Sequence, residues 1–234
     1  MKNFVITIAR GFGSGGKELA MELASQLNIN CYENRILVLA SQITNRETAE
    51  LLEIDEKLKG GLINKLKRLP KSSEPANPKS VEKKFESDAE IFECQCDIIR
   101  DLASKESCII VGKCADYVLR DFDNVVSFYV EAPRKYCLKR VTTTMNVDEL
   151  EAGNLISKTD SFRAEYYKYY TNGNYWTNPV NYDMTFNMER VGKDKVKEII
   201  KNYLIIKFGE EILQDAKNSP TLYSYATNTK EDNK

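Results

Sequence analysis

Residues 4–17 read FVITIARGFGSGGK, and this stretch decides the fold. The run Phe4–Ala9 is short, apolar and rich in β-branched residues, as a buried strand should be. A glycine-rich segment, Gly11–Gly16, then breaks the strand. Apolar residues follow at the spacing of one helix face, at Ala20, Leu23, Ala24 and Leu27. A strand, a glycine loop and a helix in this order predict the first half of a βαβ unit.

The loop and the lysine after it match the first seven positions of the pattern G-x-x-x-x-G-K-[ST]. Glycines allow consecutive backbone N–H groups to surround a phosphate, and the following helix adds its positive N-terminus. Lys17 would contribute a mobile charge to the β- and γ-phosphates. The alternative is a plain tight turn. We assign phosphate binding to Gly11, Gly13, Ser14, Gly15, Gly16 and Lys17.

Glu18 departs from this pattern, because it stands where Ser or Thr would usually hold Mg²⁺. Its carboxylate could bind the ion through water, or it could cap the helix N-terminus. The sequence therefore places Glu18 in the nucleotide site and assigns no residue to direct metal ligation.

The composition narrows the possible chemistry. Lysine and arginine (34) nearly balance aspartate and glutamate (35), so no global charge draws the chain to nucleic acid. No apolar run approaches the length of a membrane span, and no cleavable leader is visible, so we expect a cytoplasmic protein. Histidine is absent, which excludes Ser-His-Asp and Cys-His hydrolysis. Any reaction must use carboxylates, cations, hydroxyls, backbone amides or a hard cation such as Mg²⁺.

Cysteine spacing gives no indication of a metal site. The six cysteines contain no Cys-x-x-Cys pair, so we do not expect structural zinc. Reduced thiols are the usual state in a cytosolic protein of this size.

Strand and helix patterns alternate along the rest of the chain. Short apolar runs that read as buried strands occur at Ile29–Tyr32 (a weaker one), Cys108–Val111, Val125–Val130 and Tyr182–Met188. Helices are expected over Ile36–Leu69, over a stretch from Phe85 to Ala103, after Pro133 and over Lys193–Phe208. This alternation predicts an α/β protein with a five-stranded parallel sheet covered on both faces.

Two of these helices have an apolar face that should pack inward. In the helix expected between Phe85 and Ala103, the residues at helical spacing are Phe85, Ala89, Phe92, Cys96, Ile99 and Ala103. In the last, they are Val196, Ile199, Ile200 and Tyr203.

The stretch Phe4–Leu23 resembles the opening of the cytidylate kinase-like family of bacterial P-loop proteins. Three further stretches resemble that family in the same order. Ile109–Arg120 is similar to its strand-to-turn segment, Ile156–Trp176 to its lid, and Asn181–Asn187 to its last strand. The ordered set spans most of residues 2–208 and is far more specific than the loop alone.

The resemblance implies a three-layer P-loop NTPase fold with a helical lid. Residues 1–217 would form one kinase-like domain, in which 36–80 is a possible acceptor-binding insertion and 142–179 is the lid. The polar tail 218–234 lacks periodicity and is expected to be disordered. The implied reaction is transfer of the ATP γ-phosphoryl group to CMP or dCMP, with Mg²⁺ as cofactor. The partners would then be small-molecule nucleotides, with neither nucleic acid nor membrane involved.

Three residues are candidates for binding the acceptor substrate. Lys113 follows a strand at its carboxyl end, where α/β proteins bind ligands. The family usually has arginine there, and lysine keeps the charge but loses the bidentate fork; the alternative is a solvated lysine. Asp116 could contact the sugar or base of the acceptor, or cap a helix. Arg10 could touch phosphate or pair with an acidic neighbour.

The lid region supplies three more candidates. A cation that moves in with a closing segment would stabilise the charge of the transferring phosphoryl group, and Arg163 is the preferred residue for this role. Lys158 is a second catalytic candidate, with solvation as its alternative. Asp160, assigned to the substrate site, could instead orient Arg163 or cap a helix. Arg140 is assigned to the nucleotide, although helix C-termini also favour cations.

Aromatic residues are concentrated in the same region. They suit base stacking or packing of the lid helix, and the i, i+4 repeat of Tyr166 and Tyr170 favours packing. The cluster comprises Tyr166, Tyr167, Tyr169, Tyr170, Tyr175 and Trp176.

Two classes of function are consistent with the sequence. The first is a nucleoside monophosphate kinase, with a kinase for another small metabolite as a variant of it. The second is a regulatory module that holds a nucleotide with little turnover, which Glu18 and Lys113 favour because both depart from the expected residues.

Overall fold

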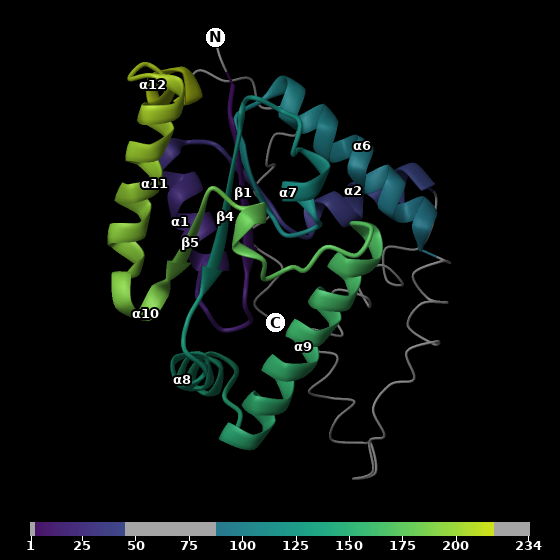
Figure 1. The fold of residues 1–234 in the computed structure, drawn as a ribbon, viewed down its shortest axis with the longest axis vertical. Helices are drawn as coiled ribbons and strands as arrows, with labels where there is room; N and C mark the ends of the chain where they lie inside the picture. The colour runs from purple at the N-terminus through teal and green to yellow at the C-terminus, as the bar shows by residue number, and fades with distance from the viewer. Residues whose placement is uncertain (1–2, 45–87, 218–234) are drawn as a thin grey trace.

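A computed structural model describes residues 3–44 and 88–217 of the chain (Figure 1). These residues contain one parallel sheet with the strand order β2-β3-β1-β4-β5. The strands are β1 (Val5–Arg10), β2 (Asn30–Tyr32), β3 (Cys108–Val111), β4 (Val125–Glu131) and β5 (Met184–Asn187). The five-stranded parallel sheet predicted from the sequence is confirmed.

Helices cover both faces of this sheet, as the alternating pattern predicts (Figure 1). One face carries α1 (Gly16–Leu27), α10 (Met188–Val191), α11 (Lys193–Phe208) and α12 (Ile212–Lys217). The other carries α2 (Arg35–Thr44), α6 (Ala89–Lys105) and α7 (Ala115–Val118). The chain thus has the three layers of a P-loop α/β fold.

Strand β1 lies at the centre of the sheet, and the sheet separates two hydrophobic cores. Successive side chains of a strand point to opposite faces, so Ile6 and Ile8 enter the core under α1 and α11. Val5 and Ala9 enter the core under α2 and α6. Each of these four side chains is at most 5% exposed, so the strand is buried on both faces and its apolar residues do not simply alternate with polar ones.

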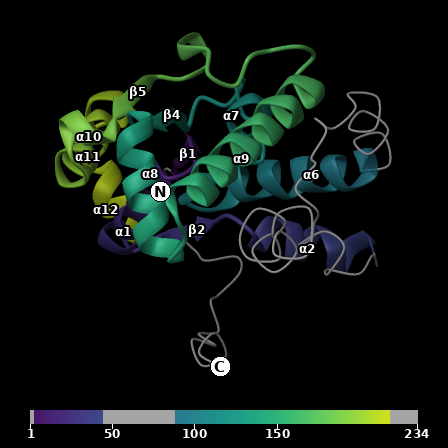
Figure 2. The ribbon, with the colours of Figure 1, turned by 90° about the horizontal axis from the view of Figure 1, so that it is seen from below.

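Two helices lie across the carboxyl ends of the strands. They are α8 (Arg134–Met145) and α9 (Glu149–Tyr170), which lie side by side when the molecule is seen from below (Figure 2). Asp148 caps α9, since its side chain accepts a hydrogen bond from the N–H of Glu151. The lid expected at 142–179 therefore consists of the end of α8, α9 and the segment that follows.

The two helix faces predicted from the sequence are mostly correct. Phe92, Cys96, Ile99 and Ala103 are buried on α6, but Ala89 is exposed because the helix begins there, beyond the edge of the core. On α11 the buried apolar residues recur every fourth position, at Val196, Ile200 and Leu204. Ile199 falls beside that row and is 37% exposed, so its inward assignment was wrong.

Several expectations fall on parts of the chain outside the described residues. They are Phe85, most of the helix expected at Ile36–Leu69, residues 45–80 of the expected insertion, and the tail 218–234.

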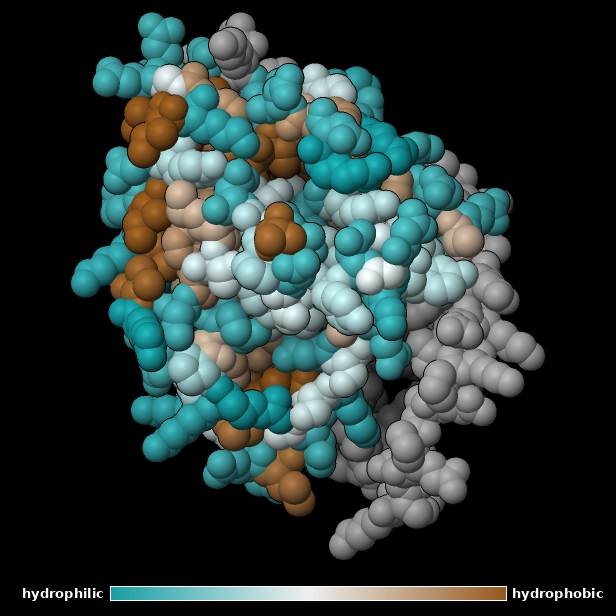
Figure 3. Space-filling view, in the orientation of Figure 1, coloured by the Kyte–Doolittle hydropathy of each residue, from teal (hydrophilic) through white to brown (hydrophobic). Residues whose placement is uncertain are grey.

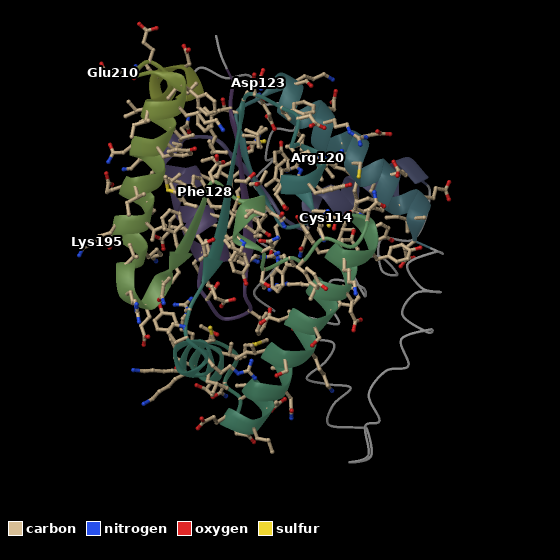
Figure 4. The ribbon with its side chains drawn as sticks, viewed as in Figure 1. Cys114, Arg120, Asp123, Phe128, Lys195 and Glu210 are labelled. Carbon is tan, nitrogen blue, oxygen red and sulfur yellow. The ribbon has the colours of Figure 1, made fainter. Side chains whose placement is uncertain are left out.

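The surface is mixed in character. In Figure 3 hydrophobic atoms are dispersed among hydrophilic ones, and several gather along the edge formed by α11, where Ile206 is exposed. Figure 4 shows the contrast between Lys195, which points away from α11 into solvent, and Phe128, which lies within the fold on β4. None of the helices in residues 3–44 and 88–217 combines the length and apolar character needed to cross a bilayer.

Candidate functional site

The glycine loop joins the carboxyl end of β1 to α1, at the point where β1 lies between β3 and β4. Gly15 is the N-cap of α1 and has a φ of 92°, a left-handed conformation that glycine adopts without a Cβ penalty. No side chain caps this helix, which leaves its N-terminus to the loop. Ser14 is fully buried, and its hydroxyl donates to the carbonyl of Gly11 at 2.8 Å. Ser14 therefore supports the loop from inside.

The start of the loop is packed against the end of β4. A Cβ at Gly11 would lie 2.4 Å from a carboxylate oxygen of Glu131. That carboxylate is held in place, since it accepts hydrogen bonds from the hydroxyl of Tyr129 at 2.7 Å and from the N–H of Ala132 at 2.9 Å. Only glycine fits beside it.

Lys17 and Arg10 both pair with Glu33, the residue that follows β2. The Lys17 ammonium lies 2.7 Å from one carboxylate oxygen of Glu33, and the Arg10 guanidinium lies 3.1 Å from the other. Arg10 was expected either to touch phosphate or to pair with an acidic neighbour, and the structure shows it paired with Glu33. Glu33 thus gathers the two cations at the mouth of the glycine loop.

Arg140 closes the other side of the loop. Its Nε donates to the carbonyl of Gly13 at 3.1 Å, and its terminal nitrogen lies 3.2 Å from the carboxylate of Glu18. Glu18 is therefore engaged by a cation and makes no side-chain cap of α1. Together these groups line a cavity over the loop, which we call the donor cavity; its walls include Arg10, Gly11–Gly13, Gly15–Glu18, Glu33, Arg140 and Arg163.

The helix α9, which lies in the segment expected to form a lid, contacts the loop directly. The carboxylate of Asp160 accepts a hydrogen bond from the backbone N–H of Phe12 at 2.9 Å. Arg163 donates to the backbone carbonyl of Arg10 at 3.0 Å and lies 3.5 Å from Asp160. Burial raises the pKa of Asp160, and the charge of Arg163 opposes this. Of the earlier alternatives, Asp160 does not cap a helix, because α9 begins eleven residues earlier at Glu149.

A second cavity lies between α6, α7 and α9, on the other side of β1 from the helix α1, and we call it the acceptor cavity. Its polar walls include Arg10, Lys113, Asp116, Arg163 and Gln95. Its apolar and aromatic walls include Leu37, Ile91, Phe162, Tyr166, Tyr167, Tyr170 and Trp176. Cations at one place and aromatic rings over the rest are suited to a phosphorylated molecule with an apolar or planar part.

Asp116 is buried in the acceptor cavity. It accepts a hydrogen bond from the hydroxyl of Tyr167 at 2.6 Å, which links α7 to α9. Burial raises the pKa of Asp116 to about 6, against the effect of hydrogen bonds from Tyr167 and from the backbone. The carboxyl group can therefore change its charge near neutral pH.

The turn after β3 carries an unusual backbone. Gly112, Lys113 and Cys114 are consecutive and all have positive φ, at 75°, 60° and 54°. Non-glycine residues adopt this conformation uncommonly, and residues that do so outside helix caps are enriched at functional sites. A Cβ at Gly112 would lie 2.4 Å from the Arg10 guanidinium, so this glycine makes room for Arg10.

The two cavities share two of their described wall residues, Arg10 and Arg163. Both side chains are largely buried, and the Arg163 guanidinium donates a hydrogen bond to the backbone carbonyl of Arg10. A group that passes between the cavities would have to pass these two cations.

The remaining predicted residues have clear positions. Lys158 is exposed on α9 and lines neither cavity, so its catalytic role stays a prediction without a contact to support it. The predicted packing of Tyr166 and Tyr170 is confirmed, because Tyr170 stacks on Phe92 with ring centroids 3.9 Å apart and Tyr166 meets the same ring edge-on, whereas Tyr169 and Tyr175 are exposed. Several of these rings also line the acceptor cavity.

Two functional-site residues were missed from the sequence. Glu33 stands directly after a short strand, where parallel strands end at the same edge, and this position could have identified it. Gln95 stands among the apolar residues of α6 at a buried position, and a polar residue on an otherwise apolar face was the available signal.

The donor cavity fits a phosphate, since it combines left-handed glycines, an uncapped helix N-terminus and a lysine. It offers less to a metal ion. Within residues 3–44 and 88–217 no three His, Cys, Asp or Glu side chains come together as a metal site, and the cysteines are free thiols.

Comparison with known proteins identifies the chain's relatives. The model of the cytidylate kinase-like family matches residues 5–190. The solved structure of an uncharacterized protein from Eubacterium ventriosum ATCC 27560 is 27% identical, with a TM-score of 0.61, and covers 86% of this chain and 98% of its own. No curated protein matches significantly.

Shikimate kinases align more distantly. The enzyme from Bacteroides thetaiotaomicron has 12% identity and a TM-score of 0.47, over 86% of this chain and 98% of its own. The enzyme from Acinetobacter baumannii has 11% identity and a TM-score of 0.45, over 89% and 97%. Because one family model matches residues 5–190, which is most of the chain and includes the glycine loop, the chain belongs to the cytidylate kinase-like family.

Proposed function

We propose that this protein transfers the γ-phosphoryl group of ATP to a small phosphorylated acceptor, with CMP or dCMP as the acceptor class. The observation that carries this proposal is the pair of cavities that meet at Arg10 and Arg163. One cavity surrounds a phosphate-binding loop, and the other has cations beside aromatic walls. Two substrates held in this way would present their reacting groups to each other across the shared residues.

The reaction needs little covalent chemistry from the protein, because positioning and charge neutralisation supply most of the catalysis. A phosphate oxygen of the acceptor would bond to the γ-phosphorus of ATP. The bond from that phosphorus to the β–γ bridging oxygen would break, and its electron pair would leave with ADP. The absence of histidine is no obstacle to such a step.

Each cation has a role that its position supports. Lys17 would exchange the Glu33 carboxylate for the β- and γ-phosphates. Arg163, held by the Arg10 carbonyl and by Asp160, would stabilise the negative charge at the transferring group. Arg140 would close the donor cavity over the nucleotide. Mg²⁺ bound with ATP would neutralise further phosphate charge, and Glu18 is the carboxylate in the donor cavity that could reach it through water once released from Arg140.

Lys113, Asp116 and Asp160 complete the proposal. Lys113 and Asp116 line the acceptor cavity, where they would bind the acceptor's phosphate and its sugar or base. Asp160 binds the glycine loop instead, so we assign it a positioning role.

The test is acceptor-dependent release of ADP from ATP and Mg²⁺. The acceptor panel contains CMP, dCMP, UMP, AMP, GMP and shikimate. We expect turnover with CMP or dCMP, and its loss in Lys17→Ala, with Lys168→Ala as an exposed-lysine control. Turnover with shikimate alone would show a kinase for another metabolite.

A nucleotide-binding module is the second candidate function. The observation that favours it is the engagement of Lys17 by Glu33 and of Glu18 by Arg140, which leaves both residues already paired. A module of this kind would bind ATP tightly and release no ADP with any acceptor. Calorimetric ATP binding together with the turnover panel separates the two candidates.

A further inference from the structure

We infer that the side-chain amide of Gln95 determines which acceptor is bound, by accepting a hydrogen bond from an amino group on the acceptor's ring. The inference rests on the proposed function for the location of the acceptor, and it adds the chemistry by which the acceptor is recognised.

Gln95 is a polar residue in a position that ordinarily holds an apolar one. It lies on α6 between Phe92 and Ile99, is 3% exposed, and lines the acceptor cavity. Its Oε1 is the one fully buried side-chain nitrogen or oxygen in the described parts of the chain that has no hydrogen-bond partner. Buried polar groups are nearly always satisfied, so an exception calls for a partner that the protein alone does not supply.

The partner that Oε1 requires is a hydrogen-bond donor. An amide oxygen accepts and cannot donate, so the ligand group opposite it must carry N–H or O–H. Two carboxylates also line the cavity, Asp88 and Asp116, and both already take part in interactions within the protein, Asp116 with the hydroxyl of Tyr167. Gln95 differs from them because its oxygen is buried and has no partner among the described residues.

The rest of the cavity describes the remainder of the ligand. Phe162, Tyr166, Tyr170 and Trp176 supply aromatic walls, which accept a flat ring. Arg10, Lys113 and Arg163 supply positive charge for a phosphate, and two of them border the donor cavity. A phosphate, a planar ring and an amino group on that ring are the three parts of an aminated nucleotide such as CMP or AMP.

Ring edges distinguish the nucleotides that meet this description. Cytosine and adenine present an exocyclic amino group next to a ring nitrogen acceptor, so the Gln95 amide can receive one hydrogen bond and donate another. Uracil presents a carbonyl oxygen in place of the amino group, and with the amide oriented as it is in the structure this oxygen would face Oε1 with a second acceptor. We therefore expect CMP to bind in preference to UMP.

The experiment is isothermal titration of wild-type protein with CMP, UMP and the 5′-monophosphate of 2-pyrimidinone riboside, which is CMP without its amino group. Wild type should bind CMP about tenfold or more tightly than either other nucleotide, because a missing partner leaves Oε1 unpaired. In Gln95→Met, which removes the amide at similar volume, the affinities for CMP and for the 2-pyrimidinone nucleotide should agree within about twofold. Gln26→Met, at an exposed site on α1, is the control and should keep the wild-type preference.

Equal affinity of wild type for CMP and the 2-pyrimidinone nucleotide overturns the inference. A preference for CMP over that nucleotide that survives in Gln95→Met overturns it too. Failure of CMP, dCMP and AMP to bind at millimolar concentration overturns it as well. The wild-type comparison decides the matter even where Gln95→Met does not fold. Preferential binding of CMP without ADP release would support the inference and refute the kinase, whereas equal turnover of CMP and UMP would do the reverse.

Discussion

The carboxylate of Asp160, on the lid helix α9, accepts a hydrogen bond from the backbone N–H of Phe12 in the glycine loop at 2.9 Å. The next turn of the same helix carries Arg163, whose guanidinium donates a hydrogen bond to the backbone carbonyl of Arg10. The lid and the loop are thus joined by one acceptor and one donor on the same helix face. Several measurable consequences follow from these contacts and from the ion pairs around them.

Loss of the Asp160 carboxylate should loosen the lid. In Asp160→Ala the Phe12 N–H loses its partner, and we expect the free energy of unfolding to fall by about 1 kcal/mol and kcat/KM by roughly tenfold. Asp160→Asn keeps an oxygen that can accept from Phe12, so it should retain more of both quantities. Urea denaturation and steady-state kinetics measure the two effects. If Asp160→Ala and Asp160→Asn lowered the free energy of unfolding and kcat/KM equally, the negative charge of Asp160, and not its hydrogen bond, would be the important feature.

Glu33 should oppose nucleotide binding, because Lys17 must leave its carboxylate before it can reach a phosphate. In Glu33→Gln the competing charge is removed, and we expect ATP to bind roughly three- to tenfold more tightly by calorimetry. Glu22→Gln is the matched control, since Glu22 pairs with Lys193 and Lys197 away from the loop. Weaker binding in Glu33→Gln would instead mean that Glu33 positions Lys17 for the nucleotide.

Arg163 should act on turnover more than on nucleotide affinity. Removal of the guanidinium in Arg163→Ala should lower kcat by roughly 100-fold or more, while the Kd for ATP changes little. Arg163→Lys keeps the charge but loses the planar guanidinium, one nitrogen of which contacts both the Arg10 carbonyl and Asp160, so an intermediate value is expected. Lys168→Ala, an exposed lysine on the same helix, is the control. An unchanged kcat in Arg163→Ala would place the catalytic cation elsewhere.

Asp116 should make stability depend on pH between about 4 and about 6. Its pKa in the folded protein, about 6, is above its ordinary value of 3.8, so the folded state binds the proton more tightly than the unfolded state. The stability from this group is full below about pH 4 and is lost as the pH rises through about 6. The loss is at most about 3 kcal/mol, given about 1.4 kcal/mol per pKa unit.

Asp116→Asn removes this titration and provides the measurement. Relative to wild type, the variant should gain stability as the pH rises from 4 to 7 in urea denaturation series, since groups common to both proteins cancel. A difference that is independent of pH would contradict the assignment.

Two glycine substitutions should have opposite effects. Gly11→Ala would displace the Glu131 carboxylate and its two hydrogen bonds, which should lower the free energy of unfolding by about 1–3 kcal/mol. In Gly153→Ala the new Cβ would lie 3.7 Å from its nearest neighbour, inside α9, so stability should rise by about 0.5–1 kcal/mol. Destabilisation of equal size in both would show that the close approach at Gly11 is unimportant.

The sequence predicted those features that local patterns encode. The glycine loop, the apolar strands and Lys193–Phe208 follow from spacing within a few residues, and α11 has those bounds. Lys17 was proposed from the loop pattern, and Arg140 and Arg163 from their expected positions in a helix and in the lid; all three line the donor cavity. Asp160 was also proposed, as a residue that could orient Arg163, but its hydrogen bond from the Phe12 N–H and the pairing of Lys17 with Glu33 were not predicted, because these contacts join residues 148 and 16 positions apart. The buried amide of Gln95 likewise depends on how α6 packs, which its periodicity alone does not specify.

The wall that the two cavities share has a thermodynamic consequence. Arg10 and Arg163 cannot respond to one bound molecule without changing the surface offered to the other. Under the proposed function the affinities for donor and acceptor would therefore be linked, and linkage is reciprocal: whatever factor ATP applied to acceptor binding, the acceptor would apply to ATP binding. Such a protein would be most fully occupied when both molecules are present, and the guanidinium groups of Arg10 and Arg163 would carry the coupling between the two binding events.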